Sequence, residues 1–287
     1  MPSAPVLIAA TLHGIRMARR IGMAILSHTD RMTTRFLAIT RFSMLEALRT
    51  RLPLITAITV LALLGASFFI REIAIAESTR FQTAFYAATV RYATVFVMAL
   101  YVIASISREF QDKGLELVLA LDLPRGEYII GKLLAFLVIA SVLSIAAGIP
   151  LFALTSPDAA AQWVLSLAIE LAVIVAMSVF CVITFNQVMP AASVVLAFYL
   201  LARAITAIRL ISANPVVGGD ALSHRFMTSL VEGIALVIPG LELWTRTTWL
   251  VDQPVAWSAL AAIVAHGALF VVVLAAAAVF DFYRKDF

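Results

Sequence analysis

Residues 107–132 read SREFQDKGLELVLALDLPRGEYIIGK, a polar and charged segment between two long apolar runs. It contains a short apolar core, Leu115 to Leu121, bounded by Gly114 and Pro124. A helix over that core has about two turns and a length of roughly 10 Å, far too short to cross a hydrocarbon layer of ~30 Å. The core is still apolar enough to need a surface to pack against. We therefore expect a short helix, between two membrane spans, that docks on another protein.

The composition is that of a polytopic membrane protein. Hydrophobic residues make up 63% of the chain and charged residues 13%, whereas soluble domains are about half apolar and about a quarter charged. The single cysteine, Cys181, excludes a disulfide framework and a cysteine-based zinc site. No basic run is interleaved with aromatic residues, so we expect the lipid bilayer, and no nucleic acid, as a partner.

Six apolar stretches are long enough to span a membrane, which predicts an all-α fold with six transmembrane helices. The third stretch is long and is expected to bend near Gly148 and Pro150. The predicted spans are about 53–70, 85–106, 129–154, 163–185, 191–211 and 256–280.

The distribution of arginine and lysine predicts the orientation. With six spans both termini lie on one side, and that side receives two thirds of the 21 Lys and Arg residues: those of segments 1–52 and 107–132 and of the C-terminal tail. The positive-inside rule makes this side cytoplasmic. All four tryptophans fall at the other side, where we expect them to form an interfacial aromatic belt.

The segments outside the spans also carry predictions. Residues 1–33 are interpreted as a cytoplasmic tail and 34–287 as one transmembrane domain, in which 34–51 suit an interfacial helix. The stretch Phe226 to Pro239 is apolar but short, and we expect a helix or helical hairpin that dips into the outer leaflet. A seventh span is the alternative, although it would place Arg284 and Lys285 outside.

One motif approaches a nucleotide-binding signature. Residues 126–132 match G-x-x-x-x-G-K, but Leu133 stands where a magnesium-binding Ser or Thr should follow, and no strand precedes the segment. The favoured interpretation is a turn at Pro124 and Gly126, with Lys132 anchoring the third span at the inner interface. Nucleophile and metal-ligand motifs are not found, so catalytic and metal-binding residues are not predicted.

Three ionisable residues lie inside predicted spans, where charge is costly and usually paired or functional. Counting from the outer ends of their spans, Arg91, Glu170 and Arg203 lie at nearly the same depth in the outer third. Glu170 can therefore neutralise one or both arginines. Two interpretations stay open: a salt bridge that joins the second, fourth and fifth spans, or a lining for a substrate path or outer gate.

A family resemblance follows from these features. The segment Arg41 to Arg51, the six spans, the 107–132 loop and the late segment VIPGLELWTRTTWL (237–250) resemble the membrane subunit of ABC-2-type ATP-binding-cassette exporters. The resemblance covers about residues 34–287 and is greatest to the branch that includes the copper-enzyme maturation permeases. It implies a permease subunit in a bacterial cytoplasmic membrane, with an N-terminal elbow helix and a cytoplasmic coupling helix.

The resemblance also implies partners and site residues. A separate ATPase subunit would bind ATP and magnesium and hydrolyse ATP, so this chain would hold no cofactor and would not be an enzyme. A second copy, or a paralogous permease, would complete the transporter. The positions expected to contact or support the ATPase are Glu109, Asp112, Gly114, Glu116, Leu117, Pro124, Arg125, Gly131 and Lys132.

Two other functions remain as alternatives. A proton-coupled secondary transporter would use Glu170 as its proton carrier, although no inverted repeat is visible in the sequence. A membrane-embedded enzyme would need a nucleophile or metal constellation. Since apolar spans look alike for lipid, peptide and drug substrates, the sequence leaves the substrate class open.

Overall fold

The structure is a computed structural model that describes residues 40–41, 43–74, 77–111, 125–213, 221–252 and 254–284. This part of the chain is helical and contains no strand, and six of its helices are long and apolar enough to cross a membrane. The prediction of an all-α protein with six spans is therefore confirmed. The helices are α2 (Leu52–Ile73), α3 (Ser78–Gln111), α5 (Arg125–Gly148), α6 (Leu151–Leu154), α7 (Pro157–Phe185), α8 (Val188–Ala213), α9 (Ala221–Val237), α10 (Leu241–Trp244), α11 (Thr248–Val251) and α12 (Trp257–Tyr283).

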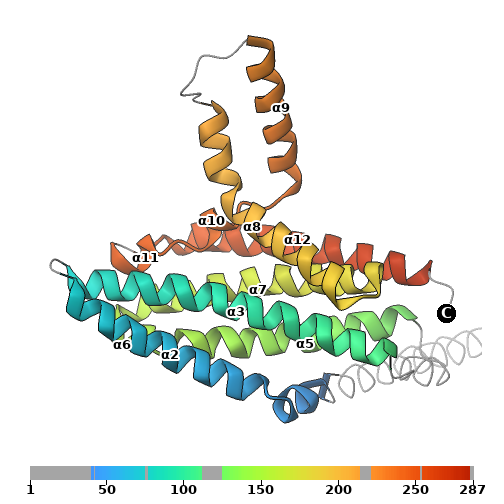
Figure 1. Cartoon of the computed structure of the whole chain (residues 1–287), viewed down its shortest axis with the longest axis horizontal. Helices are drawn as coiled ribbons and strands as arrows, with labels where there is room; N and C mark the ends of the chain where they lie inside the picture. The colour runs from blue at the N-terminus through green and yellow to red at the C-terminus, as the bar shows by residue number, and fades with distance from the viewer. Residues whose placement is uncertain are drawn as a thin grey trace, which may run out of the picture.

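Helix α7 forms the centre of the bundle. It packs against α3, α5, α8 and α12, and most of its membrane-length window is buried, whereas α2 packs mainly along α3 and is largely exposed. Figure 1 shows these long helices running side by side, with α2 at the edge. Pro157 begins α7 at a position where no backbone donor is needed, and Asn186 ends it in the left-handed conformation (φ 56°). Four of the other five long helices therefore pack directly against α7.

The third span bends where the sequence indicated. Helix α5 ends at Gly148, a turn covers Ile149 and Pro150, and the short α6 follows. Proline supplies no N–H to continue the helical ladder, and its ring crowds the preceding turn. The break turns the chain toward α7.

Two glycines allow α7 to approach its neighbours closely. A Cβ on Gly267 of α12 would overlap Cγ2 of Ile169, and a Cβ on Gly148 would overlap Cγ2 of Val164. Both neighbours are β-branched and have few alternative rotamers. Small residues at such crossings let membrane helices pack backbone to backbone, where van der Waals contact supplies much of the association energy.

Gly267→Ala is expected to lower the free energy of unfolding by about 1–3 kcal/mol, because the added methyl overpacks the crossing. Gly65→Ala is the matched control, since a Cβ there meets nothing within 4 Å. It should be neutral or stabilising by up to about 1 kcal/mol, because alanine is the better helix former. Both changes can be measured by unfolding in detergent. Equal effects would show that the α7–α12 crossing is not tight.

The predicted tryptophan belt is wrong for three of the four residues. Trp163 is completely buried, Trp244 and Trp249 are nearly so, and only Trp257 is largely exposed. The Trp163 ring lies against the Arg91 guanidinium at 5.6 Å, and Trp244 packs on Phe270. Trp244 and Trp249 belong to α10 and α11, which pack against α7 and α8 and against α3 and α7, respectively, so their rings are enclosed by other helices and not by lipid.

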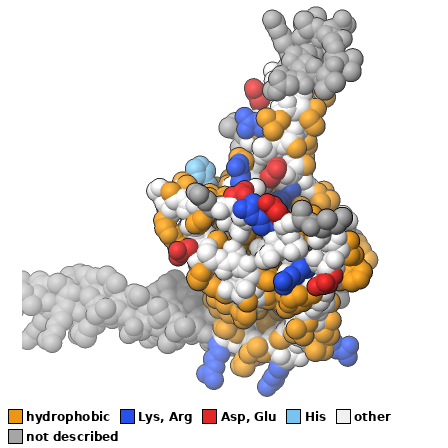
Figure 2. Space-filling view, turned by 90° about the vertical axis from the view of Figure 1, so that its left-hand side faces the viewer, with side chains coloured by type: hydrophobic (Ala, Val, Ile, Leu, Met, Phe, Trp, Pro, Cys, Tyr) orange, Lys and Arg blue, Asp and Glu red, His pale blue; other side chains and the backbone are white. Residues whose placement is uncertain are grey.

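The segment around Phe226 is helical, as predicted, and its apolar stretch of Phe226–Ala235 is too short for a comfortable span. The end of α8 and α9 form a hairpin that stands away from the bundle in both views (Figures 1 and 2). Thr228 Oγ1 donates to the Ser212 carbonyl at 3.3 Å and links the two arms. The insertion of this hairpin in the outer leaflet stays a prediction.

The orientation can be tested with single cysteines in a Cys181→Ala background. Gln111 and Arg284 lie at one end of the bundle and Ser156 at the other, and all three are exposed. If the basic end is cytoplasmic, an impermeant thiol reagent added outside intact cells will label only the cysteine at position 156. Labelling at positions 111 and 284 but not at 156 would show the opposite orientation, and labelling at both 156 and 284 would require an odd number of spans.

Candidate functional site

The three charged residues predicted within spans lie together in the structure. Glu170 of α7 is completely buried, and its Oε2 lies 3.8 Å from Nε of Arg91 on α3. Its Oε1 lies 3.7 Å from Nη1 of Arg203 on α8. One carboxylate thus joins the second, fourth and fifth spans. Arg91 and Glu170 both lie about 20 Å along their helices from the start, at the 1.5 Å rise per residue of an α-helix, which explains their common depth.

A fourth member, Thr245, was not anticipated. Its Oγ1 donates to Glu170 Oε2 at 2.7 Å and accepts from Arg203 Nη1 at the same distance. Arg203 Nη1 also approaches the carbonyl of Leu241 at 3.3 Å. Thr245 directly follows α10, in a segment without helical periodicity, so residue spacing could not have assigned it to the cluster. Its hydroxyl connects the outer segment to the core of the bundle.

Aromatic faces complete the surroundings of both guanidinium groups. Arg91 lies over the Trp163 ring at 5.6 Å, and Arg203 lies over the Tyr92 ring at 5.7 Å. Cation–π contact is most favourable where water is excluded, as it is around Arg91, which is 1% exposed. Two positive charges are therefore held by one carboxylate and two rings. We call Arg91, Glu170, Arg203 and Thr245 the core charge cluster.

A second group of charges lies at the basic end of the bundle. Lys132 of α5 is 3% exposed. Its Nζ contacts Glu109 Oε1 at the end of α3 and lies 3.4 Å from Oε2 of Glu46, which precedes α2. The Tyr128 hydroxyl donates to Glu109 Oε2, and Ser105 Oγ donates to Glu46 Oε1 at 3.0 Å. We call Glu46, Glu109, Tyr128 and Lys132 the basal network.

The basal network also reaches the end of the last span. The Tyr128 ring stacks on Phe282 of α12, and the backbone N–H of Gly126 donates to the Tyr283 hydroxyl at 3.2 Å. The Lys132 ammonium lies over the Phe136 ring at 5.4 Å. Four parts of the chain, the helical residues 43–49 and helices α3, α5 and α12, are therefore tied together on both sides of the 112–124 segment.

Two interpretations of residues 126–132 need correction. The whole stretch lies within α5, so Gly126 belongs to a helix and not to a turn, and the G-x-x-x-x-G-K spacing does not form a phosphate-binding loop. Nor does Lys132 anchor the span in the lipid interface, because its ammonium is buried between carboxylates. A buried ammonium requires such partners, whereas an interfacial lysine would extend toward water.

Only some of the other residues predicted to contact the ATPase lie in the part of the chain that the structure describes. Asp112, Gly114, Glu116, Leu117 and Pro124 lie outside the described residues, as does the predicted docking helix. Arg125 begins α5, and Gly131 is buried within it. Glu109 and Lys132 are the two predicted positions that the structure brings into contact. Among the described residues, no three His, Cys, Asp or Glu side chains are grouped as metal ligands would be.

Comparison with known proteins adds no assignment: no family model matches the chain, and no curated protein matches it.

Proposed function

We propose that the chain is the membrane subunit of an ATP-driven exporter, with its basic end in the cytoplasm of a bacterial cell. A separate ATPase subunit binds the 107–132 loop and supplies ATP, magnesium and hydrolysis. A second copy or a paralogous permease completes the path. Support comes from the six spans, from the charge asymmetry and from the loop motif, each of which suits such a subunit.

The basal network is the observation that carries this proposal. The predicted docking helix belongs to the segment that follows α3 and precedes α5 in the chain, and Glu109 of α3 and Lys132 of α5 form an ion pair. The same ammonium holds Glu46 in the segment before α2, and Tyr128 leads to α12. A push on the loop is therefore transmitted to several spans together.

The core charge cluster supports a structural link better than a proton carrier. A carrier must gain and lose its proton from each side of the membrane in turn. Glu170 instead forms ion pairs with two arginines at 3.8 and 3.7 Å, and its Oε2 accepts a hydrogen bond from the hydroxyl of Thr245. The proton-coupled transporter is therefore the second candidate, and the experiment below distinguishes it from the exporter.

The test is capture of the tagged chain from its native membranes. We expect a soluble ATPase with a phosphate-binding loop to co-purify, and ATP to drive transport after reconstitution. Glu116→Lys or Leu117→Asp should lower transport at least tenfold, because the first reverses a charge and the second introduces one in the docking surface. Glu232→Lys, an exposed charge reversal on α9, is the control and should leave transport unchanged.

Two results would contradict the proposal. One is a proton gradient that drives transport in vesicles without any ATPase. The other is normal ATP-driven transport by Glu116→Lys and Leu117→Asp while the ATPase stays bound. The first would favour the secondary transporter, and the second would remove the loop from the coupling path.

A further inference from the structure

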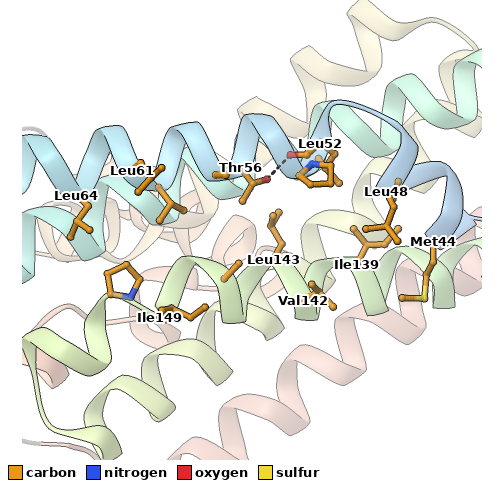
Figure 3. A pocket seen from close by; sticks show the side chains of 16 residues that line it. Met44, Leu48, Leu52, Thr56, Leu61, Leu64, Ile139, Val142, Leu143 and Ile149 are labelled. Carbon is orange, nitrogen blue, oxygen red and sulfur yellow. Dashed lines mark hydrogen bonds between the residues drawn. The ribbon is translucent and has the colours of Figure 1, made fainter.

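An open apolar groove of about 540 Å³ lies between α2 and α5. Figure 3 shows its walls: α2 and the residues before it contribute side chains from Met44 to Leu64, and α5 and the turn after it contribute those from Ile139 to Ile149. Thr56 carries the only side-chain hydroxyl among the lining residues, and this hydroxyl donates to the Leu52 carbonyl at 2.9 Å. The groove therefore offers its occupant an apolar surface and no hydrogen bond from a side chain.

The shape of the groove follows from the way α2 is held. Helix α2 packs along α3 and touches α5 at few points, so the two helices leave a channel between them. On α2 the lining residues run from Leu52 to Leu64, about 18 Å at 1.5 Å per residue. This is slightly more than half of a ~30 Å hydrocarbon layer, the depth of about one leaflet. Its volume falls in the range of about 300–1,000 Å³ typical of small-ligand sites.

Two arginines adjoin, in the chain, residues that line this groove. Arg49 and Arg51 stand in the chain between Leu48 and Leu52, two residues that line it, and both arginines are exposed. Within the described part of the chain neither guanidinium contacts a carboxylate, whereas the nearby Glu46 is held by Lys132 and Ser105. A guanidinium matches the geometry of a phosphate through paired hydrogen bonds.

We propose that the groove binds an acyl chain of an anionic phospholipid, with the phosphate held by Arg49 and Arg51. A leaflet-deep apolar channel with two arginines at one mouth matches the two parts of such a lipid. Basic pockets beside membrane helices bind anionic headgroups by the same charge attraction. A helix of a second copy would fill the channel too, but it would not require charge at one mouth.

The experiment measures lipid bound to the purified full-length chain by native mass spectrometry, with phosphatidylglycerol and phosphatidylcholine as probes. Wild type should prefer phosphatidylglycerol by about tenfold, as expected for two surface arginines. Arg49→Gln with Arg51→Gln should abolish that preference. The control pair Arg71→Gln with Arg209→Gln, exposed arginines away from the groove mouth, should retain it.

A second pair of variants tests the channel itself. Val142 and Val273 are equally exposed, but only Val142 lines the groove. Val142→Trp should lower binding of both lipids severalfold, while Val273→Trp on α12 should bind as wild type. A photoactivatable phosphatidylglycerol, carrying its reactive group on the acyl chain, should label peptides of α2 and α5 in the wild type. This measurement needs no variant to fold.

The proposal is overturned if Val142→Trp binds lipid normally, if labelling falls on other helices, or if the four arginine changes behave alike. It is also overturned if Val142→Trp dissociates an oligomer without altering lipid binding, because a second copy would then occupy the groove. No ATPase enters any of these measurements. Their outcome is therefore independent of whether the chain is an exporter subunit.

Discussion

Replacing Glu170 with glutamine is expected to lower the free energy of unfolding by about 3 kcal/mol or more, the cost of leaving a buried charge without its partner. Two arginines depend on this carboxylate, and Arg91 is almost completely buried. Ser166→Ala is the control. Ser166 is equally buried one helical turn away and donates only to the Trp163 carbonyl, so its loss should cost no more than about 1 kcal/mol.

Double-mutant cycles assign the partner. Each cycle combines Glu170→Gln with Arg91→Met or with Arg203→Met, and unfolding is followed in detergent. Contacting charges should show coupling of about 1–3 kcal/mol, above the ~0.6 kcal/mol typical of polar pairs within membranes. Additive effects in both cycles would mean that the carboxylate stabilises neither arginine. The alternative role, lining a substrate path or an outer gate, would then be favoured.

Lys132→Met is expected to reduce ATP-driven transport at least tenfold. It removes the ammonium that holds Glu46 and Glu109 together, so α3, α5 and the segment before α2 lose their common contact. The two carboxylates are 27% exposed and can recover some hydration, so we expect a loss of stability of only about 1–3 kcal/mol. The protein should therefore remain folded while its transport rate falls at least tenfold.

Arg71→Met provides the control for that variant. Arg71 is an exposed basic residue in the last turn of α2, outside both the basal network and the 107–132 loop. It should alter neither transport nor stability. Adding Glu109→Gln to Lys132→Met should restore part of the stability, since one of the stranded charges is removed. Full transport by Lys132→Met would exclude the basal network from coupling.

The six spans could be predicted from the sequence because crossing a bilayer requires an apolar stretch of a minimum length. A helix must remain apolar for about 18 residues to cross a bilayer, and each of the six stretches that met this condition is helical in the structure, the third as α5 and α6 with a turn between them. The helices are longer than predicted: α3 begins at Ser78 and ends at Gln111, beyond the apolar run of 85–106. Helical hydrogen bonding continues into the polar ends, where hydropathy gives no signal.

From the sequence, only those site residues could be grouped that lie at the same depth along their spans. Arg91, Glu170 and Arg203 were grouped by their distance along each span, and they do meet. Thr245 and Glu46 lie outside the spans, so counting could not place them. The tryptophans failed for a related reason: their position along a helix was correct, but sequence does not distinguish a face turned to lipid from one turned to another helix.

Because the chain is synthesised from its N-terminus, Arg91 enters the membrane before its partner on α7 does. Arg91 enters the membrane with the second span, whereas Glu170 arrives only with the fourth. At a synthesis rate of about 5–20 residues per second, the carboxylate follows the arginine by roughly 4–16 s. On insertion scales an arginine at the centre of a span costs about 2.5–3.5 kcal/mol, and Arg91 lies toward the outer end of its predicted span, where the cost is smaller. During that interval the second span carries an unpaired arginine, and drawing the guanidinium toward the interface lowers its cost until the fourth span emerges.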